Sequence, residues 1–488
     1  MDLPLIGESD QAANPTEQET PVTDASPVNQ TTYDAEACVI GAGPAGLAAA
    51  KALADRDISF DWFEKGSMVG GLWRIDNDNG GAAAYQTLHL NSSRPLTQYP
   101  SFPMPADWPD YPSHQLMARY FQDFADHFGL TGRVTFNSPV EKVEPLPGPG
   151  RPGDSGWSVT TPNGTGSYRQ VIVGNGHHSE PRVPDLPGKF TGESFHAHDY
   201  LEPEVFEDRD VLVIGVGNSG MDIACDATKL AKSVTVVTRH GVHVLPKYAF
   251  GRPIDQFGSP LNAYLPFPVE RRVYEVIQRF STGAPQDRGL PEPDHRLLSA
   301  HPTVSSEFCD RVGHGDIAMK PDIDRLDGRT VHFVDGTSAD VDLLVYATGY
   351  RVALPFLDTD IYDPADNEMP LYQRVLTPDL PGLFFIGYVQ TVGSNIPLAE
   401  MQSEWIGDLI TGACVLPTES EIADWIAADQ AAMARRYVRS TRHTMQVDFW
   451  RYAHALRNCR KRTEADPPSG VAGRIQQKLT AKLSRASA

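Results

Sequence analysis

A chain of 488 residues with 40% hydrophobic and 22% charged side chains is long enough for two or three globular domains, each with its own core. The formal net charge of −21 argues against a nucleic-acid partner, because such binding depends on Lys and Arg neutralising phosphates. The chain has no apolar run long enough to span a bilayer and no secretory signal, so we expect a cytoplasmic protein without a transmembrane segment.

Polar segments flank the part of the chain that shows hydrophobic periodicity. Residues 1–33 are acidic and polar, and we expect a disordered leader there. The tail after about residue 466 is also polar, but Ile475, Leu479 and Leu483 fall on one helical stripe among Lys and Arg. This stripe is compatible either with a helix over 474–485 that makes a weak peripheral membrane contact or with a frayed, solvated end.

Two segments between these ends repeat one order of elements: a buried strand, a glycine turn, a helix and a second strand. The first is AEACVIGAGPAGLAAAKALADRDISFDWFEKG and the second is RDVLVIGVGNSGMDIACDATKLAKSVTVVTRHG. Further buried strands are predicted at VIVGNG, VDLLVYATGY and LFFIGY, and a helix from Leu398 through Ile410. The repeated β–α–β order predicts an α/β fold with parallel sheets.

The first glycine turn has the spacing of a dinucleotide-binding turn. Gly41 permits the tight turn, Gly43 lets the backbone approach a pyrophosphate, and Gly46 allows the helix to pack closely on the strand. The N-terminus of the helix then offers free N–H groups to the anion. Glu64 closes the second strand, where a carboxylate can accept hydrogen bonds from a ribose diol. This turn therefore predicts FAD or NAD.

The second turn has the same glycine spacing, with Gly215, Gly217 and Gly220. The strand that follows its helix ends in Arg239, where the first unit has Glu64. A guanidinium suits a 2′-phosphate through charge-assisted hydrogen bonds and does not suit a bare diol. The second nucleotide is therefore predicted to be NADPH and the first FAD. An ordinary surface arginine at this position is the alternative.

Two dinucleotide sites in one chain predict hydride transfer from the nicotinamide to the flavin. Many flavoproteins with two nucleotides pass the electrons on to a cysteine pair, but the five cysteines here show no C-x-x-C spacing. Small substrates and dioxygen are therefore the expected acceptors.

Four histidines, His177, His178, His196 and His198, lie in the strip GHHSEPRVPDLPGKFTGESFHAHDY between the two units. A metal site is disfavoured, because adjacent imidazoles do not easily turn to one ion and no Cys, Asp or Glu completes a familiar ligand spacing. The Gly and Pro residues of the strip instead favour a chain that crosses from one domain to the other. No metal is expected.

The ordered set of motifs resembles the class B flavin-containing monooxygenases over about residues 36–451. The set comprises GAGPAG, FEKGSMVGGLW, the stretch that begins LHLNSSRPL, VIVGNGHHSEPRVPDLPG, GVGNSGMDIA, YATGY and FFIGYVQTVGSNIPLAEMQSEW. FTGESFHAHDY matches the signature F-x-G-x-x-x-H-x-x-x-Y through Phe190, Gly192, His196 and Tyr200. The resemblance implies two Rossmann-like dinucleotide-binding domains, with the NADPH domain inserted into a discontinuous FAD domain.

The expected boundaries are the leader at 1–33, the first part of the FAD domain with the linker at 34–200, the NADPH domain at 201–330, the second part of the FAD domain at 331–450, and a C-terminal helix with a polar tail at 451–488. Residues 251–310 match the family poorly and are expected to border the substrate entrance.

The resemblance also implies the reaction. NADPH reduces FAD, dioxygen adds to the flavin as a C4a-hydroperoxyflavin, and the nitrogen of an amine or the sulfur of a sulfide takes one oxygen atom, which gives an N-oxide or a sulfoxide. Baeyer–Villiger oxidation of ketones is the nearest alternative, although that family usually carries Trp at the position of Tyr200. An uncoupled NADPH oxidase and a flavoprotein scaffold without turnover also remain open, as does a homodimer.

The resemblance assigns chemistry to individual residues. It implies that Asn91 hydrogen-bonds near the flavin and that His196 sets the two domains and NADP(H) relative to each other. A structural turn asparagine and plain packing of His196 are the alternatives. The predicted cofactor-binding residues, from the two turns and from the resemblance, are Gly41, Gly43, Pro44, Gly46, Glu64, Gly71, Leu72, Trp73, Leu90, Asn91, Thr348, Gln402, Gly215, Gly217, Asn218, Ser219, Gly220 and Arg239.

Overall fold

The computed structural model describes residues 32–81, 83–437 and 444–463. The first glycine turn belongs to a seven-stranded sheet in the order β3-β2-β1-β6-β5-β4, with β22 paired to β6. The strands β3, β2, β1, β6 and β22 are parallel, and β5 and β4 are antiparallel additions. The bounds are β1 Ala35–Ile40, β2 Phe60–Phe63, β3 Val134–Thr135, β4 Lys142–Pro145, β5 Trp157–Thr161, β6 Gly164–Val173 and β22 Leu383–Phe385.

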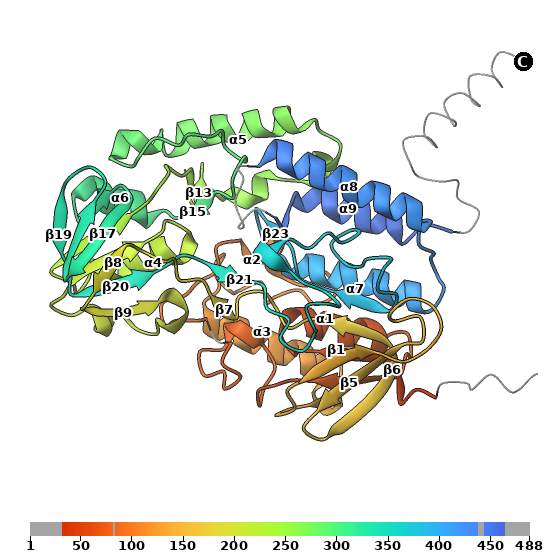
Figure 1. The fold of residues 1–488 in the computed structure, drawn as a ribbon. Helices are drawn as coiled ribbons and strands as arrows, with labels where there is room; N and C mark the ends of the chain where they lie inside the picture. Colours follow the sequence, from red (N-terminus) through yellow and green to blue (C-terminus); the bar gives the residue numbers. More distant parts are fainter. Residues whose placement is uncertain (1–31, 82, 438–443, 464–488) are drawn as a thin grey trace, which may run out of the picture. The chain divides into compact units, whose positions relative to one another are not determined.

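The second glycine turn belongs to a separate sheet of five parallel strands in the order β16-β11-β10-β20-β9 (Figure 1). A four-stranded sheet, β19-β18-β17-β8, packs its apolar side chains against one face of this sheet. The bounds are β8 Gly188–Phe190, β9 Glu193–His196, β10 Asp210–Ile214, β11 Ser233–Val237, β16 Ile317–Lys320, β17 Ile323–Gly328, β18 Thr330–Phe333, β19 Ser338–Asp340 and β20 Leu343–Tyr346. The predicted α/β fold with two dinucleotide-binding units is confirmed.

The strand pairing moves two segments into the second sheet. β9 and β20 lie outside the predicted range 201–330, yet both pair in this sheet, and β20 pairs directly with β10. The apolar run VDLLVY is a buried strand as predicted, but local hydrophobicity does not say which sheet it joins. The second unit therefore extends beyond the predicted boundaries at both ends.

The chain passes between the two large sheets twice, and the two passages pair with each other. β7 and β21 form a short antiparallel ribbon, in which Tyr350 is opposite Pro181 and Arg351 is opposite Glu180. β7 begins two residues after His178, so this part of the strip is a crossing segment. The bounds of the short strands are β7 Glu180–Pro181, β12 Val244–Leu245, β13 Tyr248–Ala249, β14 Arg252–Pro253, β15 Thr303–Val304, β21 Tyr350–Arg351, β23 Gln390–Thr391 and β24 Gln446–Val447.

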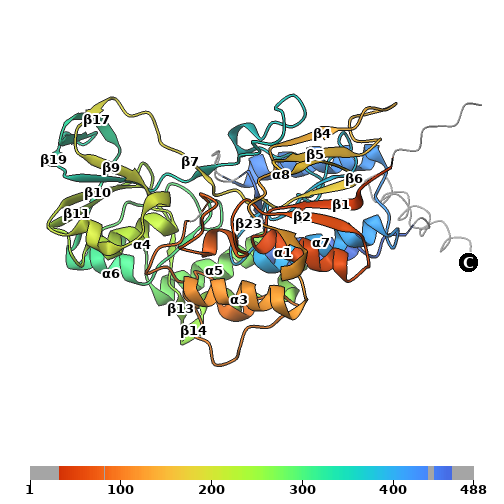
Figure 2. The same cartoon turned by 90° about the horizontal axis from the view of Figure 1, so that it is seen from below.

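Helix α1 begins directly after the first glycine turn and packs on α7 beside the first sheet (Figure 2). The alanines of α1 are buried in the core. Just beyond the C-terminal end of the helix, Arg56 forms ion pairs with Glu404 and Asp408 of α7. The predicted helix from Leu398 through Ile410 is confirmed as α7, which begins two residues earlier. The helices are α1 Pro44–Ala54, α2 Arg94–Thr97, α3 His114–His127, α4 Asn218–Ala227, α5 Phe267–Ser281, α6 Glu307–His314, α7 Ile396–Ile410, α8 Glu419–Arg436 and α9 Phe449–Cys459.

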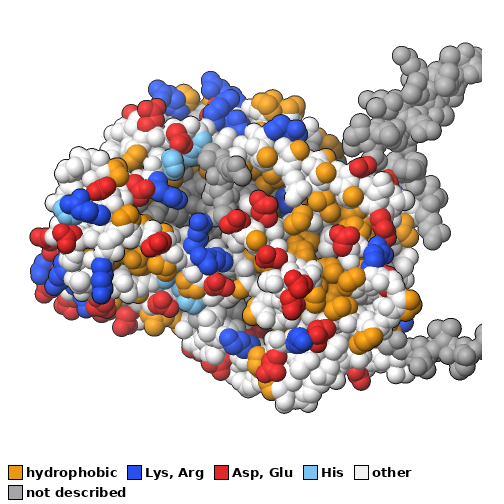
Figure 3. Space-filling model, viewed as in Figure 1, with side chains coloured by type: hydrophobic (Ala, Val, Ile, Leu, Met, Phe, Trp, Pro, Cys, Tyr) orange, Lys and Arg blue, Asp and Glu red, His pale blue; other side chains and the backbone are white. Residues whose placement is uncertain are grey.

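Within the described ranges, no helix is both long and apolar enough to cross a membrane. On the face drawn in Figure 3, acidic and basic side chains are interspersed. The predicted leader lies outside the described residues except for its last two, and the predicted helix over 474–485 lies wholly outside them.

Candidate functional site

The first glycine turn has the backbone that its spacing predicts. β1 ends at Ile40, Gly41 adopts a φ of 94°, and α1 begins at Pro44. A Cβ atom on Gly46 would lie 1.7 Å from the carbonyl oxygen of Gly41, so only glycine lets the helix start this close to the strand. Gly43 occupies the N-cap of α1 and no side chain caps the helix, which leaves its first N–H groups available to an anion.

The GGLW segment lies against this turn. Gly70 donates its N–H to the Ala42 carbonyl at 2.9 Å, and a Cβ on Gly71 would come within 2.9 Å of the Gly43 Cα. Leu72 and Trp73 continue this segment as a single 3-10 turn over Gly71–Trp73. The two glycine backbones therefore form a close cradle of a kind that fits a pyrophosphate.

Glu64 lies at the end of β2, as predicted, and is buried. Its carboxylate accepts hydrogen bonds from the N–H groups of Ala42 at 2.6 Å and Gly66 at 2.8 Å, and from the Asn79 amide at 3.0 Å. A carboxylate has about four lone-pair sites, so these three donors leave it one for a ribose hydroxyl. Glu64 thus fits a nucleotide and also fixes the shape of the turn.

The second turn repeats this geometry beside β10. Gly215 has a φ of 111°, and a Cβ there would lie 2.5 Å from the Ala347 carbonyl oxygen, while a Cβ on Gly220 would lie 2.3 Å from the Gly215 oxygen. Gly217 is the uncapped N-cap of α4. Asn218 accepts a hydrogen bond from the Val304 N–H at 3.0 Å and so ties the turn to β15, and Ser219 follows it in the first turn of α4.

Arg239 lies two residues beyond the end of β11, the strand that pairs with β10 beside this turn. Its side chain is exposed, and in the part of the chain that the structure describes its guanidinium has no hydrogen-bond or ion-pair partner. An unpaired guanidinium beside a helix N-terminus fits a phosphate group. The residues of both turns therefore fit the dinucleotides that the sequence predicts.

Two of the predicted residues carry buried polar atoms without a partner among the described residues. Asn91 follows the buried Leu90, and its Oδ1 atom has no hydrogen bond. His196 is buried at the end of β9, where its Nδ1 accepts from the His198 N–H at 3.1 Å and its Nε2 makes no hydrogen bond of good geometry. Burial lowers the pKa of His196, although the nearby Gly349 backbone opposes this, so the ring is neutral near pH 7. Unpaired buried polar atoms are costly in a folded protein and point to a missing ligand.

The histidines of the strip gather around a tyrosine ring. The rings of His178, His196 and His198 lie 5.1, 5.2 and 5.9 Å from the ring of Tyr350, and His177 contacts His178 at 4.2 Å. Within the described ranges, no group of three or more His, Cys, Asp or Glu is placed to hold a metal ion. The imidazoles instead pack where the two crossing segments meet.

Thr348 and Gln402 lie apart from each other. Thr348 follows β20 in the second sheet, close to the second turn, and its hydroxyl donates to the Arg182 carbonyl. Gln402 is fully buried in α7, where its oxygen accepts from the Gly387 N–H at 2.9 Å and its nitrogen donates to Tyr452 at 2.8 Å. Its amide therefore holds Gly387, whose Cβ position lies 3.2 Å from Ala45 at the start of α1.

Two carboxylates of α4, Asp222 and Asp226, make contacts that the sequence did not predict. Asp222 accepts from the hydroxyl of Tyr85 at 2.9 Å, and Asp226 accepts from the hydroxyls of Tyr200, at 2.9 Å, and Thr87. These contacts join the segment before Asn91 to the helix of the second turn. Tyr85 and Thr87 lie more than a hundred residues from these carboxylates, and Tyr200 lies 26 residues from Asp226. No local spacing therefore signals the contacts, and the Tyr of the family signature was the only pointer.

Comparison with known proteins agrees with this geometry. The profile of the Flavin-binding monooxygenase-like family matches residues 35–465. This chain belongs to that family. The protein is therefore a flavin-dependent oxidoreductase, and the predicted resemblance is confirmed.

Individual relatives match over most of the chain. Flavin-containing monooxygenase 5 of Oryctolagus cuniculus is 33% identical over 432 residues, which cover 84% of this chain and 80% of that protein. Dimethylaniline monooxygenase [N-oxide-forming] 2 of Mus musculus is 32% identical, with coverages of 86% and 81%. The solved structure of S-allyl-L-cysteine S-oxygenase from Allium sativum has a TM-score of 0.66 at 24% identity and covers 93% of both chains, which shows the same fold.

Proposed function

We propose that this chain is an NADPH-dependent flavin monooxygenase that transfers one oxygen atom of O2 to a soft nucleophile, the nitrogen of an amine or the sulfur of a sulfide. The observation that carries the proposal is the pair of glycine turns in two separate sheets. In the first unit the strand after the helix is followed by the buried Glu64, and in the second unit it is followed by the exposed Arg239. A curated relative named as N-oxide-forming supports a heteroatom as the acceptor.

The residues of the two turns would hold FAD and NADPH. The N-termini of α1 and α4 would bind the two pyrophosphates, and Glu64 would accept a hydrogen bond from the FAD ribose. Arg239 would bind the 2′-phosphate of NADPH, since its guanidinium offers donors in a planar fork.

The bound flavin, once reduced by NADPH, supplies electrons that activate dioxygen. The residues of the chain position the reactants and exclude water, so little general acid–base machinery is needed. Asn91 would hydrogen-bond at the flavin ring through its unpaired Oδ1 or its amide N–H groups, and the neutral His196 would offer its Nε2 to the nicotinamide nucleotide. Tyr200, rather than the Trp usual in Baeyer–Villiger enzymes, supports oxygenation of heteroatoms over ketones.

The overall reaction is balanced as sulfide, O2, NADPH and a proton giving sulfoxide, NADP⁺ and water. The test supplies FAD-loaded protein with NADPH and ¹⁸O2 and offers methyl p-tolyl sulfide, trimethylamine and cyclohexanone separately. We expect one ¹⁸O atom in the sulfoxide or the N-oxide and little lactone. Lactone as the dominant product, or NADPH consumption that yields only hydrogen peroxide with every substrate, would overturn the proposal.

A cytoplasmic location, a homodimer and a peripheral membrane contact through residues 474–485 stay predictions. Size-exclusion chromatography with light scattering tests the homodimer, and sedimentation with anionic vesicles, compared with a chain shortened at residue 465, tests the membrane contact.

A further inference from the structure

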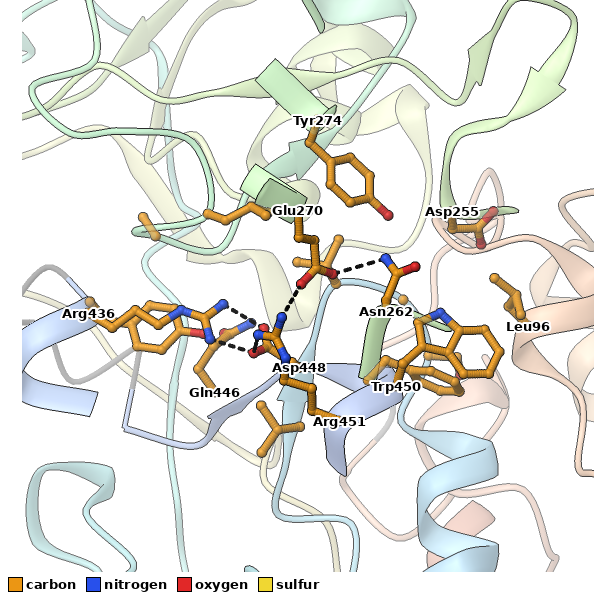
Figure 4. Close-up of a pocket in the computed structure, with 18 residues that line it drawn as sticks. Leu96, Asp255, Asn262, Glu270, Tyr274, Arg436, Gln446, Asp448, Trp450 and Arg451 are labelled. Carbon is orange, nitrogen blue, oxygen red and sulfur yellow. Dashed lines mark hydrogen bonds and ion pairs between the residues drawn. The ribbon is translucent and has the colours of Figure 1, made fainter. Parts of the chain in front are cut away.

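A pocket opens between α5, the start of α9 and the loop before α7 (Figure 4). It contains about 690 Å³ of space, its open mouth included. Aromatic side chains line it from two sides, Tyr274 from α5 and Phe449 and Trp450 from α9. Part of the lining comes from residues 251–310, the region that the sequence predicts to border the substrate entrance.

The pocket adjoins the flavin side of the molecule through two segments. On one side, the Ser93 N–H donates to Asp255 Oδ2 at 2.5 Å, and Ser93 lies two residues after Asn91. On the other side, the chain runs from Gly387, which packs near Ala45 at the start of α1, to Val392 and the next two residues, which line the pocket. A molecule in this pocket would therefore lie beside the site that Asn91 marks.

Most charges in the pocket wall are already paired. Arg436 forms two hydrogen bonds of 2.5 Å to Asp448, and its guanidinium carbon lies 3.5 Å from the centre of the Phe267 ring. Arg451 contacts Asp448 and Glu270, both at 2.9 Å. Two arginines thus balance two carboxylates, and neither pair leaves a net charge for a ligand.

Asp255 is the remaining carboxylate of the pocket lining. Among the described residues, no Lys, Arg or His forms an ion pair with it. Its Oδ2 accepts from Ser93, whereas its Oδ1 is shielded from bulk water and has no hydrogen-bond donor among the described residues. Burial raises the pKa of Asp255, although the hydrogen bond from Ser93 opposes this rise. A carboxylate oxygen without a donor in such a place is costly, and a ligand with N–H donors would relieve the cost.

We propose that this pocket binds an ammonium group of the substrate, with Asp255 as its anionic partner and the rings of Tyr274 and Trp450 beside it. Aromatic faces attract organic cations, so the ring lining and the carboxylate favour the same ligand. The inference builds on the proposed function and narrows its substrate class.

The ammonium must be distinct from the atom that is oxygenated. A protonated nitrogen has no lone pair and cannot accept oxygen, so a nitrogen held as a cation at Asp255 is not the nucleophile. The substrate class is therefore a sulfide or a neutral amine that carries a second, protonated amine. For an aminoalkyl sulfide, sulfur gains one oxygen atom from O2, the other oxygen leaves as water, NADPH supplies the two electrons, and the ammonium is unchanged.

The first test compares 3-(methylthio)propylamine with 3-(methylthio)propan-1-ol at pH 8, where the amine is protonated. The two sulfides differ in the terminal group alone. We expect kcat/KM for sulfoxide formation to be about 10-fold or more higher for the amine, because a charge-assisted hydrogen bond is worth about one to two factors of ten. Equal values, or a preference for the alcohol, would overturn the inference.

The second test uses Asp255→Asn, which keeps an acceptor for the Ser93 N–H and removes the charge. We expect KM for the amine to rise about 10-fold, with KM for the alcohol and both kcat values nearly unchanged. Asp107→Asn is the matched control, because Asp107 is exposed and lies outside the pocket lining. A variant that loses both substrates equally shows a structural role for Asp255 and overturns the assignment.

Equilibrium binding gives a readout independent of turnover. Calorimetry of the FAD-loaded protein with n-butylammonium chloride should show binding that Asp255→Asn weakens and n-butanol does not reproduce. If the wild type oxygenates neither of these sulfides and, in the earlier test, neither methyl p-tolyl sulfide nor trimethylamine, the proposed function fails. If both are oxygenated without preference and butylammonium does not bind, only the assignment of the pocket fails.

Discussion

Arg239 is the residue that makes the second dinucleotide site chemically different from the first, because the first unit has Glu64 at the corresponding place. Replacing it with glutamine removes the guanidinium from an exposed position at which no described residue depends on it. We expect Arg239→Gln to raise KM for NADPH about 10- to 100-fold and to leave KM for NADH unchanged, because only NADPH carries the 2′-phosphate. Steady-state kinetics with both cofactors measures this.

The matched control is Arg325→Gln, which removes an exposed guanidinium from β17, and it should change neither constant. Equal losses with NADPH and NADH in Arg239→Gln would contradict a phosphate contact.

Asn91 has a buried side-chain oxygen without a hydrogen-bond partner among the described residues, and a bound flavin would explain it. Asn91→Leu therefore removes a polar group without breaking a hydrogen bond of that oxygen. We expect flavin to stay bound, sulfoxide formation to fall about 10- to 100-fold, and more hydrogen peroxide to be released per NADPH. An unchanged ratio of peroxide to sulfoxide would show that Asn91 is a turn residue.

Site residues were predictable from the sequence where the motif that identifies them is local, and were not where their role depends on a distant residue. The glycines, Glu64 and Arg239 were predictable because turn, helix start and strand end lie within one β–α–β unit. Asp226 and Asp255 were not, since each contacts a residue more than a hundred positions away, Thr87 and Ser93 respectively. The histidine strip shows the same limit, because the ring that gathers its imidazoles belongs to Tyr350, well beyond the strip.

At the scale of elements, the start of α1 provides a matched pair of glycines. A Cβ on Gly43 would meet the Gly71 Cα at 3.6 Å, an ordinary contact, whereas a Cβ on Gly46 would lie 1.7 Å from the Gly41 oxygen. We expect Gly43→Ala to fold but to bind flavin poorly, because the added methyl occupies the place of the pyrophosphate. Gly46→Ala should instead destabilise the fold by several kcal/mol or leave it insoluble.

Circular dichroism and the ratio of flavin to protein absorbance separate the two outcomes. A folded, fully flavin-loaded Gly43→Ala protein would contradict the assignment of this turn to FAD.

The elements themselves were easier to predict than their grouping. The order of β1, α1 and β2 and the run of α7 follow from local periodicity. β20 and β22 are both short apolar runs followed by glycine, yet one joins the second sheet and the other the first. Strands buried on both faces look alike in sequence, and their partners are set by contacts far along the chain.

At the scale of the whole molecule, α4 is held to the segment before Asn91 by its two carboxylates. Tyr85 donates to Asp222, and Thr87 and Tyr200 both donate to Asp226, which also pairs with Lys229 at 2.7 Å. These contacts join the helix of the second turn to the chain that leads into the flavin side. The junction between the two proposed cofactor sites therefore includes a carboxylate, Asp222, whose charge depends on pH.

Asp222 gives this junction a measurable pH dependence. Burial raises its pKa to about 6, although the hydrogen bond from Tyr85 and the charge of Lys247 oppose the rise. Because the folded-state pKa lies above the unfolded value of about 4, the folded state binds the proton more tightly, so this residue favours folding below pH 4 and loses that contribution as the pH rises through 6. Asp222→Asn keeps an acceptor for Tyr85 and removes the charge. We expect the variant to be about 1–2 kcal/mol more stable than wild type at pH 8, after allowance for partial exposure, and the difference in stability to vanish between pH 6 and pH 4.

Unfolding midpoints of the flavin-loaded wild type and variant, measured across this pH range, give the difference in stability. A difference that stays constant with pH would show that a group other than Asp222 titrates.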